Sequence, residues 1–327
     1  MKRLFRALAV LTCFSTLFAA CSGGGTPVPT ATGLLYVLDR ITKTVYVYDN
    51  IGTINGAVDP VRTISGDNTL IQNPTALAVD TLRDILYVSE STGEQVLVFT
   101  PASTKDGNIA PLRTYPGLTK GAGLYYDLDN DVLYAADSVD RSIKAWDGVS
   151  QLATGASFTR RIGLNYQPSA LFVDTQRDLL YVGDPATATI NVYASASTLG
   201  TNNPSPTTSI QDSTQAFVDI NSITVNVPNN FLFVGEDFNP SVEIFEKAST
   251  LNGAVPTDRS LEGGSTGLTL DMGQVIFLQN VLYVQLSRTQ IGVWDNANSV
   301  TGDDAPDRNL TINPAQQILG FAIDLAH

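Results

Sequence analysis

Histidine and cysteine are almost missing from this chain of 327 residues. The only histidine is His327, and the two cysteines are Cys13 and Cys21. Most general-base catalysis relies on imidazole, and most zinc sites use several histidines or cysteines. No Gly-x-x-x-x-Gly-Lys-Ser/Thr, His-Glu-x-x-His or Cys-x-x-Cys motif occurs either. These absences argue against a Ser/His/Asp triad and against a metal site built on histidine.

The apolar stretch near the N-terminus is short. It extends over 12 residues, from Ala7 to Phe18, which is too few for a helix that spans a bilayer. Basic residues precede it and the small pair Ala19-Ala20 follows it, which is the order typical of a cleaved secretory signal; the basic residues are Lys2, Arg3 and Arg6. We therefore expect residues 1–20 to be a signal peptide.

Cys21 follows this leader directly. The segment Phe18-Ala19-Ala20-Cys21 resembles the bacterial lipobox, although that motif usually has Leu where this chain has Phe18. The resemblance implies that Cys21 is lipidated and becomes the first residue of the mature protein. Several acyl chains on one residue give a stable membrane anchor. The alternative is a plain secretory signal with an incidental Cys21.

The expected location follows from this anchor. The residues from 21 to 32 are rich in Gly, Pro, Ser and Thr, which predicts a flexible tether between the membrane and the body. Ser22 after the lipidated cysteine resembles lipoproteins sorted to the outer membrane. We expect a cell-envelope protein, on the outer membrane where the organism has one and otherwise on the outer face of the cell membrane.

The chain has fewer basic than acidic residues, 19 against 32. Its formal net charge is −13, and removal of the three basic leader residues makes the mature chain more acidic still. Such a protein repels nucleic acids and anionic lipid headgroups, so we expect no nucleic-acid partner. The excess negative charge would suit cations or basic partners, although solubility alone also accounts for it.

What the chain does contain is a repeat of about 50 residues. A short apolar run ending in an aromatic residue recurs six times, at Tyr36, Tyr87, Tyr134, Tyr181, Phe233 and Tyr283. A second, alternating run, which is typical of a strand, ends each time in another aromatic residue, at Tyr48, Phe99, Trp146, Tyr193, Phe245 and Trp294. Fourteen residues later stand Arg62, Arg113, Arg160, Thr207, Arg259 and Arg308. We expect these arginines on outer strands, paired with acidic side chains or solvent.

A further apolar run precedes the first in each unit, as in Ala76 to Asp80, so one unit contains four strands, which we call a, b, c and d. Four strands per repeat of this length predict an all-β fold, a six-bladed β-propeller over residues 33–327. The chain enters its first unit at strand b with Leu34 and ends with Ile318 to Asp324, a run of type a. We therefore expect the C-terminal strand to close the first blade, which removes the open sheet edges.

The units resemble the NHL-repeat and related six-bladed propeller families over about residues 33–325. The resemblance rests on the Pro-x-x-Ala-x-x-Val-Asp type of strand a, from Pro74 to Asp80 and from Pro168 to Asp174. A Leu-Tyr-Val-x-Asp/Glu strand and an Ile/Val-x-Val-Tyr/Phe strand follow it. The fourth unit departs from the pattern, because Asn226 replaces the aspartate of strand a. The resemblance implies the propeller architecture.

One face of the predicted ring is the better candidate for function. The c–d connections have constant length, whereas the d–a connections vary, and these lie with the b–c turns around the mouth of the central channel. Variable loops on a rigid scaffold are where binding usually occurs. Nine residues before each second aromatic stand Asp39, Glu90, Asp137, Asp184, Glu236 and Gln285, with Asp237 beside them.

Five of the six column positions carry a carboxylate, and the sixth carries Gln285. Two interpretations of these five carboxylates are open. They are candidates for a ligand or cation site, with Ca²⁺ preferred because only oxygen donors are available. Alternatively, each one caps its own b–c turn by accepting backbone N–H bonds, as the equivalent aspartate of NHL-like repeats does. Apart from this possible Ca²⁺, the sequence implies no cofactor.

The functional hypothesis follows from regular repeats without a catalytic motif. We expect a non-enzymatic, lipid-anchored binding module that uses its loop-bearing face to hold an envelope protein or a small ligand. The alternative is a metal-dependent lactonase-like hydrolase, since six-bladed lactonases hold a divalent metal at the channel mouth with Glu, Asn and Asp. No catalytic residue is assigned.

Overall fold

The computed structural model describes residues 33–214 and 217–327 of the chain. The predicted signal peptide, Cys21 and the tether lie outside the described residues. Within those residues no helix has the length and apolar character needed to cross a bilayer.

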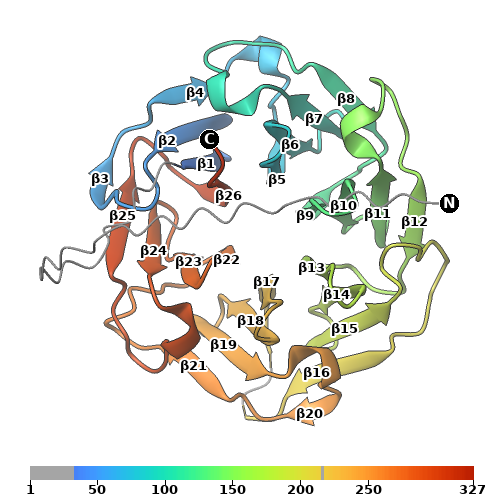
Figure 1. The fold of residues 1–327 in the computed structure, drawn as a ribbon, viewed down its shortest axis with the longest axis vertical. Helices are drawn as coiled ribbons and strands as arrows, with labels where there is room; N and C mark the ends of the chain where they lie inside the picture. Colours follow the sequence, from blue (N-terminus) through green and yellow to red (C-terminus); the bar gives the residue numbers. More distant parts are fainter. Residues whose placement is uncertain (1–32, 215–216) are drawn as a thin grey trace, which may run out of the picture. The chain divides into compact units, whose positions relative to one another are not determined.

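Six antiparallel sheets stand in a ring, each with strands in the order a-b-c-d from the centre outwards (Figure 1). The a strands are β26 (Ile318–Asp324), β5 (Pro74–Asp80), β9 (Gly121–Asp127), β13 (Leu171–Asp174), β17 (Ile220–Asn226) and β22 (Val275–Leu278). The b strands are β1 (Leu34–Asp39), β6 (Ile85–Glu90), β10 (Val132–Asp137), β14 (Leu179–Asp184), β18 (Phe231–Glu236) and β23 (Val281–Gln285). Both lists are in order from blade 1 to blade 6. The six-bladed β-propeller predicted from the sequence is confirmed.

The outer half of each blade follows the same order. The c strands are β2 (Thr44–Asp49), β7 (Gln95–Phe99), β11 (Ser142–Asp147), β15 (Thr189–Ala194), β19 (Ser241–Glu246) and β24 (Gln290–Trp294). The d strands are β4 (Arg62–Ile64), β8 (Arg113–Pro116), β12 (Arg160–Gly163), β16 (Thr208–Asp212), β21 (Arg259–Glu262) and β25 (Arg308–Ile312). Two short strands, β3 (Gly56–Val58) and β20 (Gly253–Val255), add a fifth strand to blades 6 and 4.

Short 3₁₀ turns complete the described elements. They are η1 (Asp67–Thr69), η2 (Ala102–Thr104), η3 (Val149–Gln151), η4 (Ala248–Thr250) and η5 (Ala297–Ser299). η1 lies in a d–a connection, and the other four lie in the c–d connections of blades 2, 3, 5 and 6. These four connections therefore contain a 3₁₀ turn instead of a tight hairpin.

The C-terminal strand closes the ring as the sequence predicts. β26 pairs antiparallel with β1, from Leu34 opposite Asp324 to Asp39 opposite Ile318. Blade 1 therefore takes its a strand from the end of the described chain and its other three strands from the beginning. Closure leaves no blade with a missing inner strand.

The core lies between blades rather than inside one of them. The buried apolar side chains form six clusters, and each cluster joins two adjacent blades. Both aromatic columns predicted from the repeat are buried, with Trp146 and Tyr134 among the residues that are fully inaccessible. Each blade therefore depends on its neighbours for the apolar contacts that stabilise it.

The c–d connections join the blades a second time, at the rim. Each of them reaches back to the d strand of the preceding blade: β3 pairs parallel with β25, β20 pairs parallel with β16, and single bridges or backbone bonds do the same elsewhere. This contact explains the constant c–d length, because the connection must span a fixed distance between neighbouring blades.

The arginine column contributes to the same rim. Three of its members contact acidic side chains, as predicted: Arg62, Arg160 and Arg308. Four members also donate to backbone carbonyls in the c–d connection of the next blade, a role that we did not predict; these are Arg113, Arg160, Arg259 and Arg308. A guanidinium has enough donors to satisfy carboxylate and carbonyl acceptors together.

Candidate binding site in the central channel

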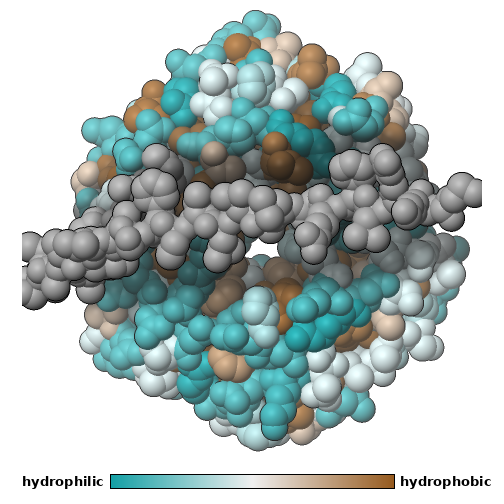
Figure 2. All heavy atoms as spheres, viewed as in Figure 1, coloured by the Kyte–Doolittle hydropathy of each residue, from teal (hydrophilic) through white to brown (hydrophobic). Residues whose placement is uncertain are grey.

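A cavity of about 610 Å³ lies at the centre of the ring and is lined by the a strands of all six blades. Figure 2 shows its opening in the middle of the molecular surface. The innermost strand of a blade has one edge without a partner strand, so alternate backbone N–H and C=O groups of each a strand face this cavity. The channel therefore combines a hydrogen-bonding backbone with the side chains described below.

β-Bulges aim particular side chains into the channel mouth. In four blades the register between strands a and b shifts by one residue near the start of strand a. The extra residues of these bulges are Leu319, Thr75, Ala122 and Asn221, and all four line the cavity. A bulge turns one side chain away from the regular alternation of the strand. Since these four residues differ in chemistry, the wall of the channel differs from blade to blade.

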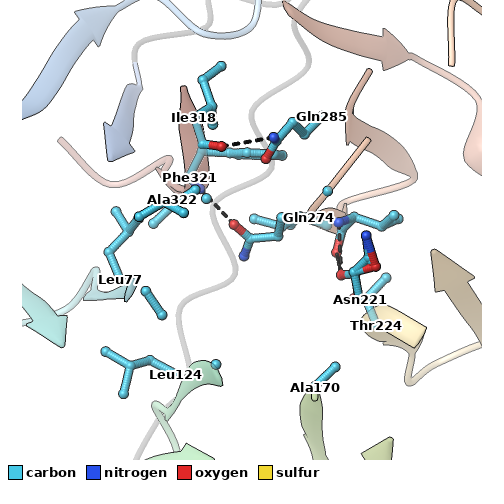
Figure 3. A pocket seen from close by; sticks show the side chains of 18 of the residues that line it. Leu77, Leu124, Ala170, Asn221, Thr224, Gln274, Gln285, Ile318, Phe321 and Ala322 are labelled. Carbon is cyan, nitrogen blue, oxygen red and sulfur yellow. Dashed lines mark hydrogen bonds between the residues drawn. The ribbon is translucent and has the colours of Figure 1, made fainter. Parts of the chain in front are cut away.

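The wall of the channel is apolar on one side. Leu77 of β5, Leu124 of β9 and Phe172 of β13 line the cavity from blades 2 to 4. Figure 3 shows Leu77 and Leu124 on this side, away from Gln274, Gln285 and Asn221. An apolar ligand group placed here would lose little hydrogen bonding and would bury hydrophobic surface.

The opposite side carries amide side chains among its apolar residues. Gln274 accepts a hydrogen bond from the backbone N–H of Phe321 (2.6 Å), and Gln285 donates to the carbonyl of Ile318 (3.0 Å). Both bonds join blade 6 to the closing strand β26 of the neighbouring blade 1, and Figure 3 shows them as dashed lines. Asn221 donates through its amide to the carbonyl of Met272 (3.1 Å). The polar wall therefore comes from blades 5 and 6.

Three buried amide or carboxyl oxygens of blades 5 and 6 have no hydrogen-bond partner among the described residues. Oδ1 of Asn221 and Oε1 of Gln285 belong to residues that line the cavity, and the third is Oε1 of Glu236 at the end of β18. Gln285 and Glu236 are only 4% and 2% exposed. A buried acceptor without a donor carries a free-energy cost of about 1–3 kcal/mol. Acceptors held in this way are suited to a ligand that brings hydrogen-bond donors.

The electrostatics of the mouth favour a cationic donor. Asp237 and Asp271 line the cavity, and Arg288 is the only basic residue among the described residues that line it; its Nε lies 2.9 Å from Oδ1 of Asp271. Burial is the main cause that raises the pKa of Glu236 to about 7, and the nearby Asp219 and Glu243 raise it further. Burial likewise raises the pKa of Asp237. A positive charge at this place would favour the ionised form of both carboxyls.

The five predicted carboxylates lie at the ends of the b strands, and all are buried. Each accepts hydrogen bonds within its own blade, and in four blades these include backbone N–H groups of the d–a connection: Asp39 from Gln316 and Gln317, Glu90 from Asn73, Asp137 from Thr119, and Glu236 from Val218 and Asp219. Asp184 accepts from Ala186 and Thr187 of its b–c turn. Asp39, Glu90, Asp137 and Asp184 also accept backbone N–H bonds from their own b–c turns, which is the turn-capping alternative. The bonds that Glu236 accepts come from the d–a connection instead.

The structure does not bring these five carboxylates together. Among residues 33–214 and 217–327, the only set of three acidic or histidine side chains close enough to share an ion lies elsewhere, at Asp84, Asp324 and His327. Cation binding by a single member of the column stays a prediction. What the column does is fix the loops that surround the channel mouth, because each buried carboxylate satisfies backbone donors there.

Sequence reasoning missed the polar wall of the channel. Asn221 and Gln274 belong to no repeated column, and their only signal is that the start of strand a varies in chemistry between units.

Sequence reasoning also missed a Gly-x-Ser-x-Gly match at residues 263–267. That segment lies between β21 and β22 instead of a strand-to-helix turn, and the Ser265 hydroxyl donates to Asp303 (3.0 Å). The match therefore does not indicate a nucleophile.

Comparison with known proteins identifies the architecture alone. No protein-family model matches the chain, and no curated protein matches its sequence. The solved structure described as the nidogen/laminin complex contains a chain that is 14% identical, with a TM-score of 0.62 over 90% of this chain and 99% of that one. As many as 1053 chains match in all, so the fold is widespread and does not by itself indicate a function.

Proposed function

We propose that this chain is a non-enzymatic binding protein of the cell envelope, held to the membrane through a lipid on Cys21. Its site is the loop-bearing end of the channel, and its ligand is a partner protein that inserts a basic side chain there. We also propose that the six repeated units of the propeller are of the NHL-repeat type. The observation that carries it is the pair of unlike walls, with unpartnered acceptors on blades 5 and 6 and apolar side chains on blades 2 to 4.

The chemistry of a lysine or arginine side chain suits both walls. Its aliphatic stem contacts apolar groups, and its charged end donates several hydrogen bonds. The acidic residues at the mouth supply the attraction, and the net charge of −13 steers basic partners towards the protein. The nidogen/laminin structure is described as a complex, which supports a protein partner for a propeller of this kind.

Crosslinking in the native envelope tests the proposed site. We expect the full-length, anchored protein to capture a defined partner, and the double variant Asn221→Ala/Asp237→Asn to capture at least about tenfold less, since it removes acceptors and charge. Leu82→Ser is the matched control, because Leu82 is exposed in an a–b turn at the other end of the ring. Hexylammonium, which combines a cationic head with an apolar tail, should compete with the partner. Equal capture by the double variant would exclude the channel as the site.

Cys21→Ala tests the anchor separately. Without a thiol at this position no acyl chain can be attached, so we expect the protein to move from the membrane pellet to the soluble fraction. Fractionation followed by immunoblotting measures this, with Cys13→Ala as the control because Cys13 lies in the leader. Retention of the Cys21→Ala protein in the pellet after a carbonate wash would contradict lipidation.

A further inference from the structure

A second group of polar side chains lies at the junction of blades 1 and 2, at the end of the ring that carries the a–b turns. Asp324 ends β26, His327 follows three residues later, and Asp84 comes from the turn between β5 and β6. One imidazole nitrogen and one oxygen of each carboxylate lie within 4.8 Å of one another. Nδ1 of His327 is 2.9 Å from Oδ2 of Asp324.

The equivalent junction between blades 2 and 3 contains a permanent cation. There Asp80 ends strand a, and Arg83 follows at the same spacing of three residues. The guanidinium of Arg83 lies 3.1 Å from Asp80 and 3.8 Å from Asp131, which holds the position of Asp84 in the next blade. Arg177 makes the same contact with Asp174 in blade 4. His327 therefore occupies a register position at which two other blades place an arginine.

A histidine at this position brings different chemistry to the junction than an arginine. Arginine is a permanent cation that does not coordinate metal ions, whereas an imidazole nitrogen is a common ligand of divalent metal ions. Asp324 is fully buried, so solvent does little to compensate a charge there. A metal ion bound by the imidazole would supply the positive charge that the arginine supplies elsewhere.

The surroundings of this group offer a further polar atom and space. Tyr36 of β1 is fully buried, and its hydroxyl has no hydrogen-bond partner among the described residues. Burial raises the pKa of Tyr36, and the charges of Asp84 and Asp324 raise it further. Next to His327, a pocket of about 360 Å³ that Arg62 and Ser103 also line leaves room for water molecules bound to an ion.

We propose that Asp84, Asp324 and His327 bind a divalent transition-metal ion between blades 1 and 2. One nitrogen and two oxygen donors match Zn²⁺, which accepts histidine and carboxylate ligands together, and disfavour Ca²⁺, which takes oxygen ligands. The ion would bind β26 of blade 1 to the a–b turn of blade 2, and so stabilise the strand that closes the ring. The site escaped the sequence analysis because Asp84 is separated from His327 by most of the chain.

Zinc titration of the purified full chain, freed of metal with EDTA, tests this site. We expect calorimetry to find one Zn²⁺ per chain and the midpoint of thermal unfolding to rise by several degrees, because the ion binds the folded state alone. Ca²⁺ should give no rise. His327→Ala and Asp84→Asn should each lose the bound zinc and the rise. Asp131→Asn, which changes the equivalent aspartate of the next junction, should keep both.

His327→Arg separates the metal from other effects of this junction. It restores the cation of the other blades, so we expect a midpoint close to that of the zinc-loaded protein, without any response to zinc. His327 is exposed at the surface, so neither variant of it should prevent folding. The absence of stoichiometric zinc binding by the unaltered chain, or unchanged binding by His327→Ala, would overturn the proposal.

Discussion

Deletion of residues 318–327 is expected to unfold the whole propeller and not merely blade 1. The deletion removes β26, whose Phe321 and Ile323 pack in the cluster between blades 6 and 1. It also removes every ladder partner on one side of β1 and the backbone groups that Gln274 and Gln285 bind. The lost burial and the two newly opened blade junctions together exceed the roughly 5–15 kcal/mol that stabilises an ordinary domain. Circular dichroism, chemical denaturation and the soluble yield measure the outcome.

A circular permutant is the control for this deletion. In blade 2, four residues join Asp80 to Ile85, and in blade 1 direct fusion of His327 to Gly33 would place four residues between Asp324 and Leu34. The permutant of residues 314–327 followed by 33–313 should therefore fold with near-native stability, because it keeps every strand and supplies a turn of natural length. A deletion variant that stays soluble and unfolds cooperatively would contradict closure by β26.

Glu236→Gln is expected to stabilise the protein at pH 8 by up to about 3 kcal/mol and to leave its stability at pH 4 unchanged. The pKa of Glu236 rises in the folded state from its ordinary value of 4.5 to about 7, mainly because the carboxyl is buried. Between these pH values the folded chain keeps a proton that the unfolded chain has released. The contribution of this group is therefore fully present below pH 4.5 and is lost as pH rises through 7. A neutral glutamine avoids this loss.

Glu90→Gln is the matched control, because Glu90 holds the same position in blade 2. There one oxygen accepts from Asn73 and Thr92, and the other accepts from Gly93 (2.6 Å), so neither oxygen lacks a donor. Glutamine would turn one of these acceptors into a donor facing an N–H group, and we expect it to destabilise the protein at pH 8. Chemical denaturation from pH 4 to pH 8 compares the two variants. A Glu236→Gln protein whose stability parallels that of the unaltered chain would show that Glu236 titrates normally.

The fold was largely predictable because it follows from the local periodicity of apolar residues in the sequence. Alternating apolar residues with an aromatic at a constant place in each unit specify strands, and six units of four strands specify a ring. Even the closing strand followed, because the first unit lacks a strand a and the last described segment provides one. The contacts of the arginine column were predictable from the sequence only in part. Arg113 and Arg259 bind carbonyls of the next blade, and these carbonyls belong to a turn about 40 residues away in sequence.

The candidate site was far less predictable, and the reason is geometric. Repetition made the column from Asp39 to Glu236 conspicuous, yet these carboxylates bind the loops of their own blades. The residues that give the channel its unlike walls are the ones that do not repeat, such as Asn221 and Gln274. Asn221 faces the channel because a bulge shifts the register at that residue, and a bulge has no signature in this sequence.

By itself, the sequence determined the number of blades, the type of each strand, the closure of the ring and the acidity of the protein. These features depend on neighbouring residues or on sums over the chain, so no tertiary contact is needed to infer them. The tertiary structure alone decided which side chains meet: the acceptors of blades 5 and 6 opposite the leucines of blades 2 and 3, and Asp84 beside His327. Such meetings depend on the order of blades around a closed ring and on one-residue register shifts, which bring together residues that are far apart in the chain.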